Sequence, residues 1–127
     1  MILPDDVRAG MRATNDLFCS RVVRLRDIEA LDSIYTPDAH ILPPGSELIE
    51  GIDAIKQFWS HAIAELDIKD SSLVTVSAEA AGDSVVEIGR AELTPADGQK
   101  IAVKYVVHWK RDGAAWKWHT DIWNMNH

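Results

Sequence analysis

The chain lacks the features that mark disulfide-bonded, secreted and membrane-spanning proteins. It contains a single cysteine, Cys19, so no internal disulfide can form. No apolar run approaches the roughly 18 residues that a membrane-spanning helix requires. The first residues lack the basic segment and the long apolar stretch of a signal peptide. These absences predict a cytoplasmic protein with no membrane partner.

The chain is also poor in basic residues. Its 13 lysines and arginines are outnumbered by 20 acidic residues, which gives a net charge of −7. Nucleic acids and anionic membranes are bound by clustered positive charge, and nothing in the sequence supplies it. We therefore expect no nucleic-acid partner. At 127 residues the chain is long enough to bury one core, and we predict a single domain over residues 1–127.

The first half of the sequence has the pattern of amphipathic helices. The acidic residues that follow Pro4 are typical of a helix start, and apolar residues then recur every three or four positions up to Leu25. A shorter helix is predicted from Asp27 to a stop at Pro37, and a third helix follows Gly51. The predicted inner residues are Val7, Met11, Thr14, Phe18, Val22 and Leu25, then Ile28, Leu31, Ile34 and Tyr35, then Ile52, Ile55, Phe58, Trp59, Ile63 and Leu66.

The second half has the pattern of strands. After Asp70 the apolar period falls to about 2 and β-branched residues become frequent. Strands are predicted at residues 73–77, 84–94, 101–110 and 116–124, after one short strand at residues 39–42. The turns between the later strands contain Gly, Asp or Pro. Helices followed by strands predict an α+β fold, in which helices cover one face of a curved antiparallel meander sheet.

The last hairpin, residues 104–123, has two distinct faces. If Arg111 pairs with Trp116 across the turn, every other cross-strand pair of the hairpin is fixed, because the two residue numbers of each pair add up to the same value. The same construction is applied to the preceding hairpin by pairing Thr94 with Gln99. One face is then predicted to carry Glu87, Lys104, Val106, His108, His119, Asp121 and Trp123. The other face carries Val86, Ile88, Tyr105, Val107, Trp109, Trp118 and Ile122.

These two faces leave two interpretations open. In the first, the apolar face packs on the helices and the polar face is solvated. In the second, the polar face is concave and lines a pocket, where two histidines and two carboxylates form an acid/base set. The apolar face is then free for a partner subunit. A one-residue bulge would mix the two faces.

Several short motifs along the chain carry a family resemblance. They are Asp27-Ile-Glu-Ala, Ile34-Tyr-Thr-Pro-Asp-Ala, Pro44-Gly, Glu50-Gly, Ala54-Ile, Phe58-Trp and the final Asp-Gly hairpin. With them the chain resembles the SnoaL-like and ketosteroid-isomerase-like proteins of the nuclear transport factor 2-like superfamily. The resemblance implies a cone, in which a bent sheet wraps a long helix around a deep pocket. It also implies a homodimer formed through the outer sheet face, and it favours the pocket interpretation.

The resemblance also implies site residues. It places Tyr35, Phe58 and Trp59 in the pocket and Trp123 on its inner wall, and the predicted polar face adds Lys104 and Val106 to the substrate-binding set. Ketosteroid isomerases carry their catalytic Asp where this chain has Pro43. The resemblance therefore does not extend to steroid isomerisation.

A late-strand Asp remains as the acid/base candidate. SnoaL-type polyketide cyclases look to such an Asp, and Asp121 is similar in position. We expect Asp121 to have a raised pKa and to move a proton α to a carbonyl, as in an isomerase, cyclase or lyase. His108 or His119 would donate to the developing enolate, and Glu87 would orient one of them.

A second function stays open beside this chemistry. The same fold can serve as a non-catalytic module that binds a small apolar ligand or forms a dimer. No cofactor is expected in either case. A metal site is not expected, because His108 and His119 lack a third ligand with motif-like spacing.

Overall fold

The computed structural model describes residues 3–126. From the N-terminus it contains α1 (Asp5–Leu17), the π-helix η1 (Phe18–Arg24), the 3₁₀-helix η2 (Ile28–Ser33), β1 (Tyr35–Leu42), β2 (Ile49–Glu50), α2 (Ile52–Leu66), β3 (Ile68–Ala81), β4 (Ser84–Pro95), β5 (Ile101–Asp112) and β6 (Ala115–Met125). The order of helices and strands agrees with the prediction except for the short strand β2, which was not predicted, and the predicted strands are longer than expected.

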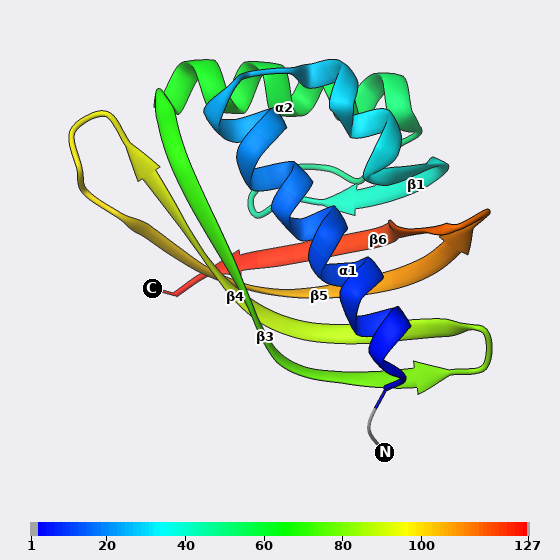
Figure 1. Cartoon of the computed structure of the whole chain (residues 1–127). Helices are drawn as coiled ribbons and strands as arrows, with labels where there is room; N and C mark the ends of the chain where they lie inside the picture. The colour runs from blue at the N-terminus through cyan, green and yellow to red at the C-terminus, as the bar shows by residue number, and fades with distance from the viewer. Residues whose placement is uncertain (1–2, 127) are drawn as a thin grey trace.

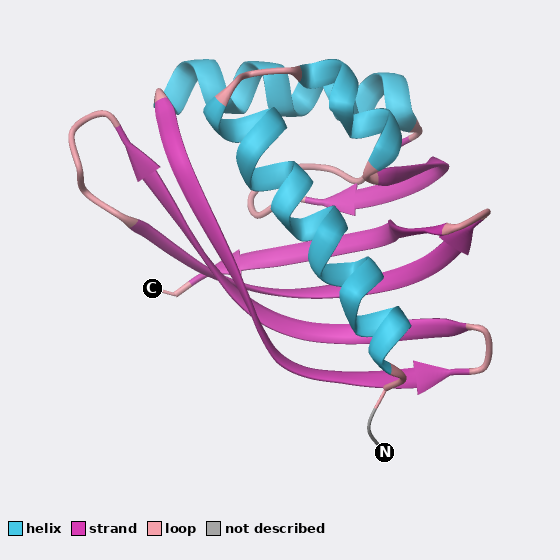
Figure 2. Cartoon of the chain, in the orientation of Figure 1, coloured by secondary structure: helices cyan, strands magenta, loops and turns pink. Residues whose placement is uncertain are grey.

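The six strands form one bent sheet in the order β2-β1-β6-β5-β4-β3. Strands β3 to β6 form the predicted antiparallel meander, whereas β1 runs parallel to β6. Both α1 and α2 lie on the concave side of the sheet, with α1 crossing the strands and α2 lying along the upper end (Figures 1 and 2). The α+β architecture is confirmed, and the core lies between the helices and the concave face.

The first helix is wound in two ways. It begins after Pro4 with two acidic residues in its first turn, as predicted, and buries Met11 and Thr14 against the sheet. The chain then continues as the π-helix η1, which buries Phe18 and Val22. The prediction that Leu25 faces inward is wrong, because the π-helix ends at Arg24 and Leu25 is 68% exposed.

The second predicted helix is shorter than expected. Its helical part is η2, and β1 begins at Tyr35, so Pro37 lies inside a strand and does not stop a helix. The ladder between β1 and β6 is interrupted between Tyr35 and His40. A proline is tolerated there because it removes no ladder hydrogen bond. The long α2 confirms the third helix and buries Ile55, Trp59 and Ile63. Within residues 3–126, none of the helices combines the length and apolarity needed to cross a membrane.

The register of the meander differs from the predicted one in two places. Arg111 pairs with Trp116 as predicted, but a bulge at His119 moves the pairing by one residue, so Val107 faces Asp121. In the preceding hairpin Glu87 also pairs with Val107 rather than with Val106. Because side chains alternate along a strand, each one-residue shift turns the side chains of β5 to the opposite face from the one predicted relative to that neighbouring strand.

The two faces of the sheet are therefore not the predicted ones. Glu87, Val107 and Asp121 form one cross-strand row on the concave face. The prediction that Lys104, Val106 and His108 share this face is wrong, since the shifted register turns them to the convex side. The residues Tyr105, Val107, Trp109 and Trp118, predicted on the opposite face from Asp121, are buried with it.

The convex face carries exposed apolar side chains. Ile88, Val106 and Ile122 lie in one cross-strand row. A cluster that we call the convex patch comprises these three residues with Val86, each 37–48% exposed. An apolar surface of this extent on a sheet is typical of a protein–protein contact.

Candidate functional site

A cavity lies between the concave face and the helices. It has a volume of about 50 Å³. Its lining is almost wholly apolar and comprises Phe18, Trp59, Leu73, Ala91, Leu93, Val103, Tyr105, Val107, Trp118, Asp121 and Trp123. The only ionisable groups on this lining are the carboxyl group of Asp121 and the phenol of Tyr105. The cavity is therefore an apolar chamber with one carboxyl group that titrates in the physiological range.

Asp121 is held by a short chain of hydrogen bonds. The phenol of Tyr35 donates to Oδ2 of Asp121 at 2.6 Å, and the indole Nε1 of Trp59 donates to the Tyr35 oxygen at 3.1 Å. Tyr35 comes from β1 and Trp59 from α2, so three elements meet at this point. The bond to Oδ2 stabilises one orientation of the carboxyl group, and the Tyr35 oxygen has a donor of its own in Trp59.

The environment of Asp121 favours its protonated form. Burial raises the pKa of Asp121 to about 7, the hydrogen bond from Tyr35 lowers it, and the charge of Glu87 raises it. Burial and the neighbouring Asp121 carboxylate also raise the pKa of the Tyr35 phenol well above its usual value. At neutral pH the carboxyl group can thus release or accept a proton, while Tyr35 keeps its own.

Aromatic rings form the wall beside this carboxyl group. Trp59 and Trp123 are stacked, with ring centroids 5.3 Å apart and an interplanar angle of 19°. Phe58 packs edge-on against both rings and Phe18 packs edge-on against Trp59. Of the predicted pocket residues, Trp59 and Trp123 line the cavity, while Tyr35 and Phe58 support it from behind.

Glu87 is a second buried carboxylate on the same face. It accepts hydrogen bonds from Thr75 Oγ1 at 2.7 Å, from the Tyr105 phenol at 2.8 Å and from Trp109 Nε1 at 2.9 Å. Neither His108 nor His119 contacts it through any of these bonds. The predicted role of Glu87 in orienting a histidine has no support in this arrangement.

Tyr105 reaches Glu87 because the neighbouring strand has a glycine. Gly89 lies directly opposite Tyr105, and the Tyr105 ring lies across the space that a Cβ at position 89 would occupy. Tyr105 and Val107 were not predicted as cavity residues, since the predicted register put them on the other face. A glycine within a strand can mark a close approach, and Gly89 was the available signal for this one.

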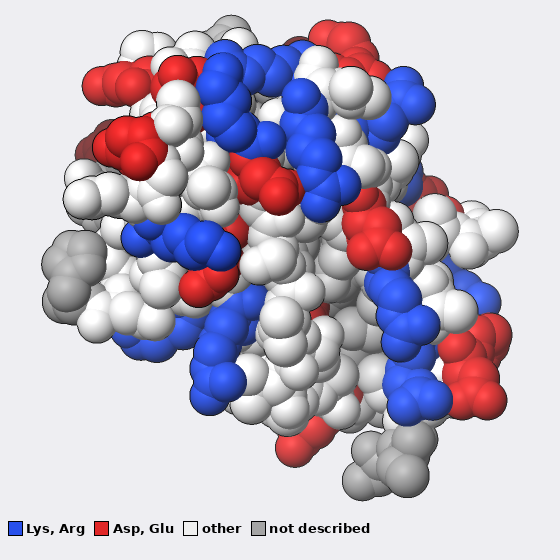
Figure 3. Space-filling view, turned by 60° about the vertical axis from the view of Figure 1, so that its left-hand side comes forward, with Lys and Arg blue, Asp and Glu red and all other residues white. Residues whose placement is uncertain are grey.

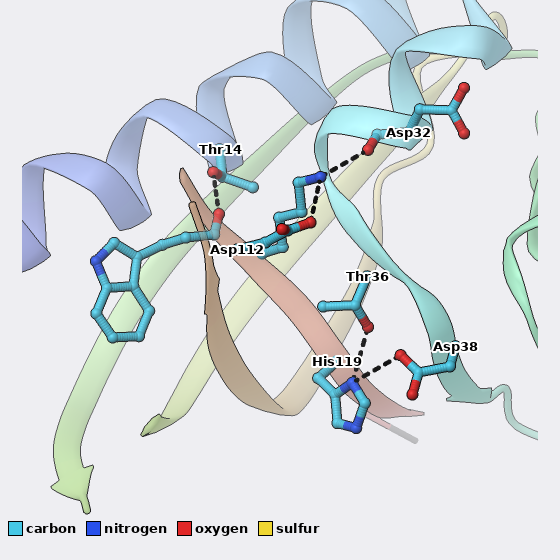
Figure 4. Close-up of polar contacts among 8 residues, drawn as sticks. Thr14, Asp32, Thr36, Asp38, Asp112 and His119 are labelled. Atoms are coloured by element: carbon cyan, nitrogen blue, oxygen red, sulfur yellow. Dashed lines mark hydrogen bonds and ion pairs between the residues drawn. The ribbon is translucent and has the colours of Figure 1, made fainter. Parts of the chain in front are cut away.

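The two candidate histidines lie apart from Asp121. His119 occupies the bulge and points away from α1, toward Thr36 Oγ1 at 2.7 Å and Asp38 at 3.8 Å (Figure 4). The ring of His108 lies 5.9 Å from that of His119. Burial and the nearby Lys110 lower the pKa of His119. The histidines form a separate cluster on the convex side.

Neither metal ligands nor the remaining predicted residues gather at the cavity. Residues 3–126 contain no group of three His, Cys, Asp or Glu side chains arranged to hold a metal ion. Lys104 and Val106, predicted to bind substrate, are exposed on the convex face, and Lys104 Nζ donates to the backbone oxygen of Met125 at 2.8 Å. The structure thus joins Asp121, Tyr35, Trp59 and Trp123 and leaves Lys104, Val106, His108 and His119 outside.

The family follows from a sequence comparison. The model of the SnoaL-like domain matches residues 18–119. The chain belongs to the SnoaL-like domain family. This match covers the η1 helix, α2 and the strands up to the bulge that precedes Asp121. No curated protein matches the chain.

Solved structures share the fold of this SnoaL-like domain. An NTF-2 like protein of unknown function from Silicibacter pomeroyi has a TM-score of 0.72 and 18% identity, over 98% of this chain and 100% of the other. A ketosteroid isomerase-like protein from Erwinia carotovora atroseptica has a TM-score of 0.75 and 16% identity, over 98% and 99%. A hexachlorocyclohexane dehydrochlorinase from Novosphingobium barchaimii has a TM-score of 0.71 and 19% identity, over 95% and 87%. At these identities the likeness concerns the fold alone.

Proposed function

We propose that the cavity binds a small carbonyl compound and that Asp121 transfers a proton at the carbon next to the carbonyl group. The observation that carries this proposal is a carboxyl group with a pKa of about 7 on the wall of an apolar cavity, oriented by Tyr35. A base with a pKa near the working pH is the most effective one for such a step. The protein would then be an isomerase, cyclase or lyase.

The proposed step uses the ionised form of Asp121. Its carboxylate takes the proton from the α-carbon, and the electrons of the C–H bond form the enolate double bond while the carbonyl oxygen gains negative charge. The protonated Asp121 then returns the proton to a carbon of the enolate. Tyr35 keeps the carboxyl group in place through its 2.6 Å hydrogen bond while the charge changes.

The enolate oxygen needs a donor on the cavity wall. The donors of Trp59, Tyr105 and Trp118 are each used in a hydrogen bond. Trp123 also lines the cavity, and its indole N–H forms no hydrogen bond within residues 3–126. We assign this N–H to the carbonyl oxygen, in place of the histidines expected from the sequence.

Deuterium exchange tests the proposed step without a known substrate. Ketones small enough for a cavity of about 50 Å³, acetone and butanone, are incubated with the protein in D₂O, and the loss of α-proton signal is followed by NMR. We expect exchange above the buffer rate, its loss in Asp121→Asn and a reduction in Trp123→Phe. His119→Gln is the matched control and should keep the wild-type rate. If Asp121→Asn exchanges as fast as the wild type, or no ketone exchanges above buffer, the proposal is rejected.

A second function is favoured by the convex patch. We propose that two copies of the chain associate through it, because the row of Ile88, Val106 and Ile122 gives an apolar centre that a symmetric partner would bury. Sedimentation should show a dimer for the wild type and a monomer for Val106→Lys. Leu48→Lys changes an exposed leucine in the β1–β2 loop and should stay dimeric. A monomeric wild type would contradict this proposal.

A further inference from the structure

A groove runs between α1 and the edge strand β3. Its volume is about 560 Å³, within the range of about 300–1,000 Å³ typical of small-molecule sites. In Figure 3 a strip of uncharged surface runs between basic side chains on the side of the molecule where α1 and β3 lie. The groove is lined by Leu3, Arg8, Met11, Arg12, Asn15, Asp16 and residues 73–78 of β3.

Three side chains connect this groove to the cavity. Leu73 lines both spaces, so they meet at this side chain. Asn15 lines the groove and accepts a hydrogen bond from Trp118, a cavity residue, at 3.2 Å. Thr75 lines the groove and donates to the buried Glu87, which also accepts a hydrogen bond from the cavity residue Tyr105. The groove and the cavity are therefore adjacent spaces that meet at Leu73.

The volumes of the two spaces indicate how they are used. One water molecule occupies a cavity volume of about 10–15 Å³. The cavity of about 50 Å³ therefore holds only a few non-hydrogen atoms of a ligand. An organic ligand of ordinary size could place one end there and would need the groove for the rest.

The charges along the groove favour an anionic group. Arg8 and Arg12 lie on its α1 side, and Asp16 is the acidic residue of the lining. Arg8 is paired with Asp5 at 2.8 Å. Within residues 3–126, the Arg12 guanidinium forms no ion pair. In a protein with a net charge of −7, the Arg12 guanidinium is thus a cation on the groove lining that can bind a carboxylate.

We propose that the groove and the cavity form one bipartite site for an elongated organic anion. Its apolar end enters the cavity past Leu73, and its carboxylate lies against Arg12. This inference rests on the proposed ligand role of the cavity, and it names the class of substrate: a carboxylic acid whose reactive carbonyl group is carried toward its apolar end.

Two probes of equal chain length test this assignment. Octanoate and 1-octanol share an apolar chain and differ in the head group, and their binding to the full chain is measured by calorimetry. We expect Arg12→Glu to weaken octanoate binding by about tenfold or more and to leave 1-octanol unchanged, because only the carboxylate contacts Arg12. Lys110→Glu makes the same charge change on an exposed β5 residue and should leave both probes unchanged.

A second variant tests the connection between the two spaces. Leu73→Trp should weaken both probes by obstructing the passage, and Leu73→Ala should bind both at least as well as the wild type. The bipartite site is rejected if the wild type binds neither probe, if Arg12→Glu and Lys110→Glu act equally, or if Leu73→Trp binds both probes normally. The two proposals can fail separately. If Asp121→Asn loses deuterium exchange of the ketones while the binding of octanoate and 1-octanol gives any of these contrary results, the bipartite site is rejected and the proposed proton transfer stands.

Discussion

The phenol of Tyr35 donates a hydrogen bond of 2.6 Å to the carboxyl group of Asp121, across 86 residues of sequence. The contact exists because β1 lies parallel to β6 and brings an N-terminal strand beside the last one. It joins two fully or almost fully buried groups, so neither can exchange its partner for water. This pair is the polar centre of an otherwise apolar site.

Asp121 makes the stability of the protein depend on pH. The unfolded carboxyl group ionises at a pKa of about 3.9, and the folded one at about 7. Between these values the folded state holds one more proton, so stability falls as the pH rises, by up to about 1.4 kcal/mol per pH unit. Asp121→Asn cannot ionise and should remove this fall. Urea unfolding at a series of pH values from 4 to 8 measures the free energy of unfolding of both proteins. If this free energy changes with pH in the same way for the variant and the wild type, the assigned pKa is contradicted.

Tyr35→Phe should raise the pKa of Asp121 further, because the hydrogen bond from Tyr35 is the interaction that lowers it. The variant also leaves the buried indole N–H of Trp59 without its acceptor, at a cost of about 1–3 kcal/mol. Carbon-13 NMR titration of the Asp121 carboxyl group checks the pKa, and thermal unfolding checks the cost. An unchanged pKa would mean that the bond is not maintained in solution.

The sequence was sufficient for the fold because the signals for it are local. The spacing of apolar residues in α2, its start after Gly51 and the alternation along the last strands each predict one element without reference to distant residues. The family resemblance then supplied the curvature and the internal cavity. The π-helical turn of η1 and the extension of β1 through Pro37 were missed, because packing against the sheet overrides local preference there.

The site was only partly predictable, because register depends on single residues. The bulge at His119 and the different pairing across the β4–β5 loop each shift the register by one. The two shifts cancel between Glu87 and Asp121, so these carboxylates share a face as predicted. They do not cancel for β5 between them, so Val107 takes the place predicted for Val106 in this row and His108 turns to the convex face. No local signal in the hairpin marks a bulge at His119.

Gly89→Ala should destabilise the protein although it adds only a methyl group. The new Cβ would overlap the ring of Tyr105, whose hydroxyl group is bonded to Glu87, and such overpacking typically costs about 1–3 kcal/mol. The cost should fall when Tyr105→Ala removes the ring, which a double-mutant cycle in urea measures. Equal costs in both backgrounds would contradict the close packing of Gly89 and Tyr105.

Glu87→Gln should change both the stability of the protein and the titration of Asp121. Thr75, Tyr105 and Trp109 all donate to the Glu87 carboxylate. An amide replaces one acceptor oxygen by NH₂, so at least one of these bonds must be lost or reversed, at a cost of about 1–3 kcal/mol. Removing the charge of Glu87 also removes an interaction that raises the pKa of Asp121, so that pKa should fall. Carbon-13 NMR titration of the Asp121 carboxyl group measures this shift, which should be opposite in sign to the shift in Tyr35→Phe.

Glu79→Gln is the control variant: it removes the same charge at an exposed position on β3 and should leave the pKa of Asp121 unchanged. Equal shifts in Glu87→Gln and Glu79→Gln would show that net charge, and not the row of Glu87, Val107 and Asp121, sets the titration of the site.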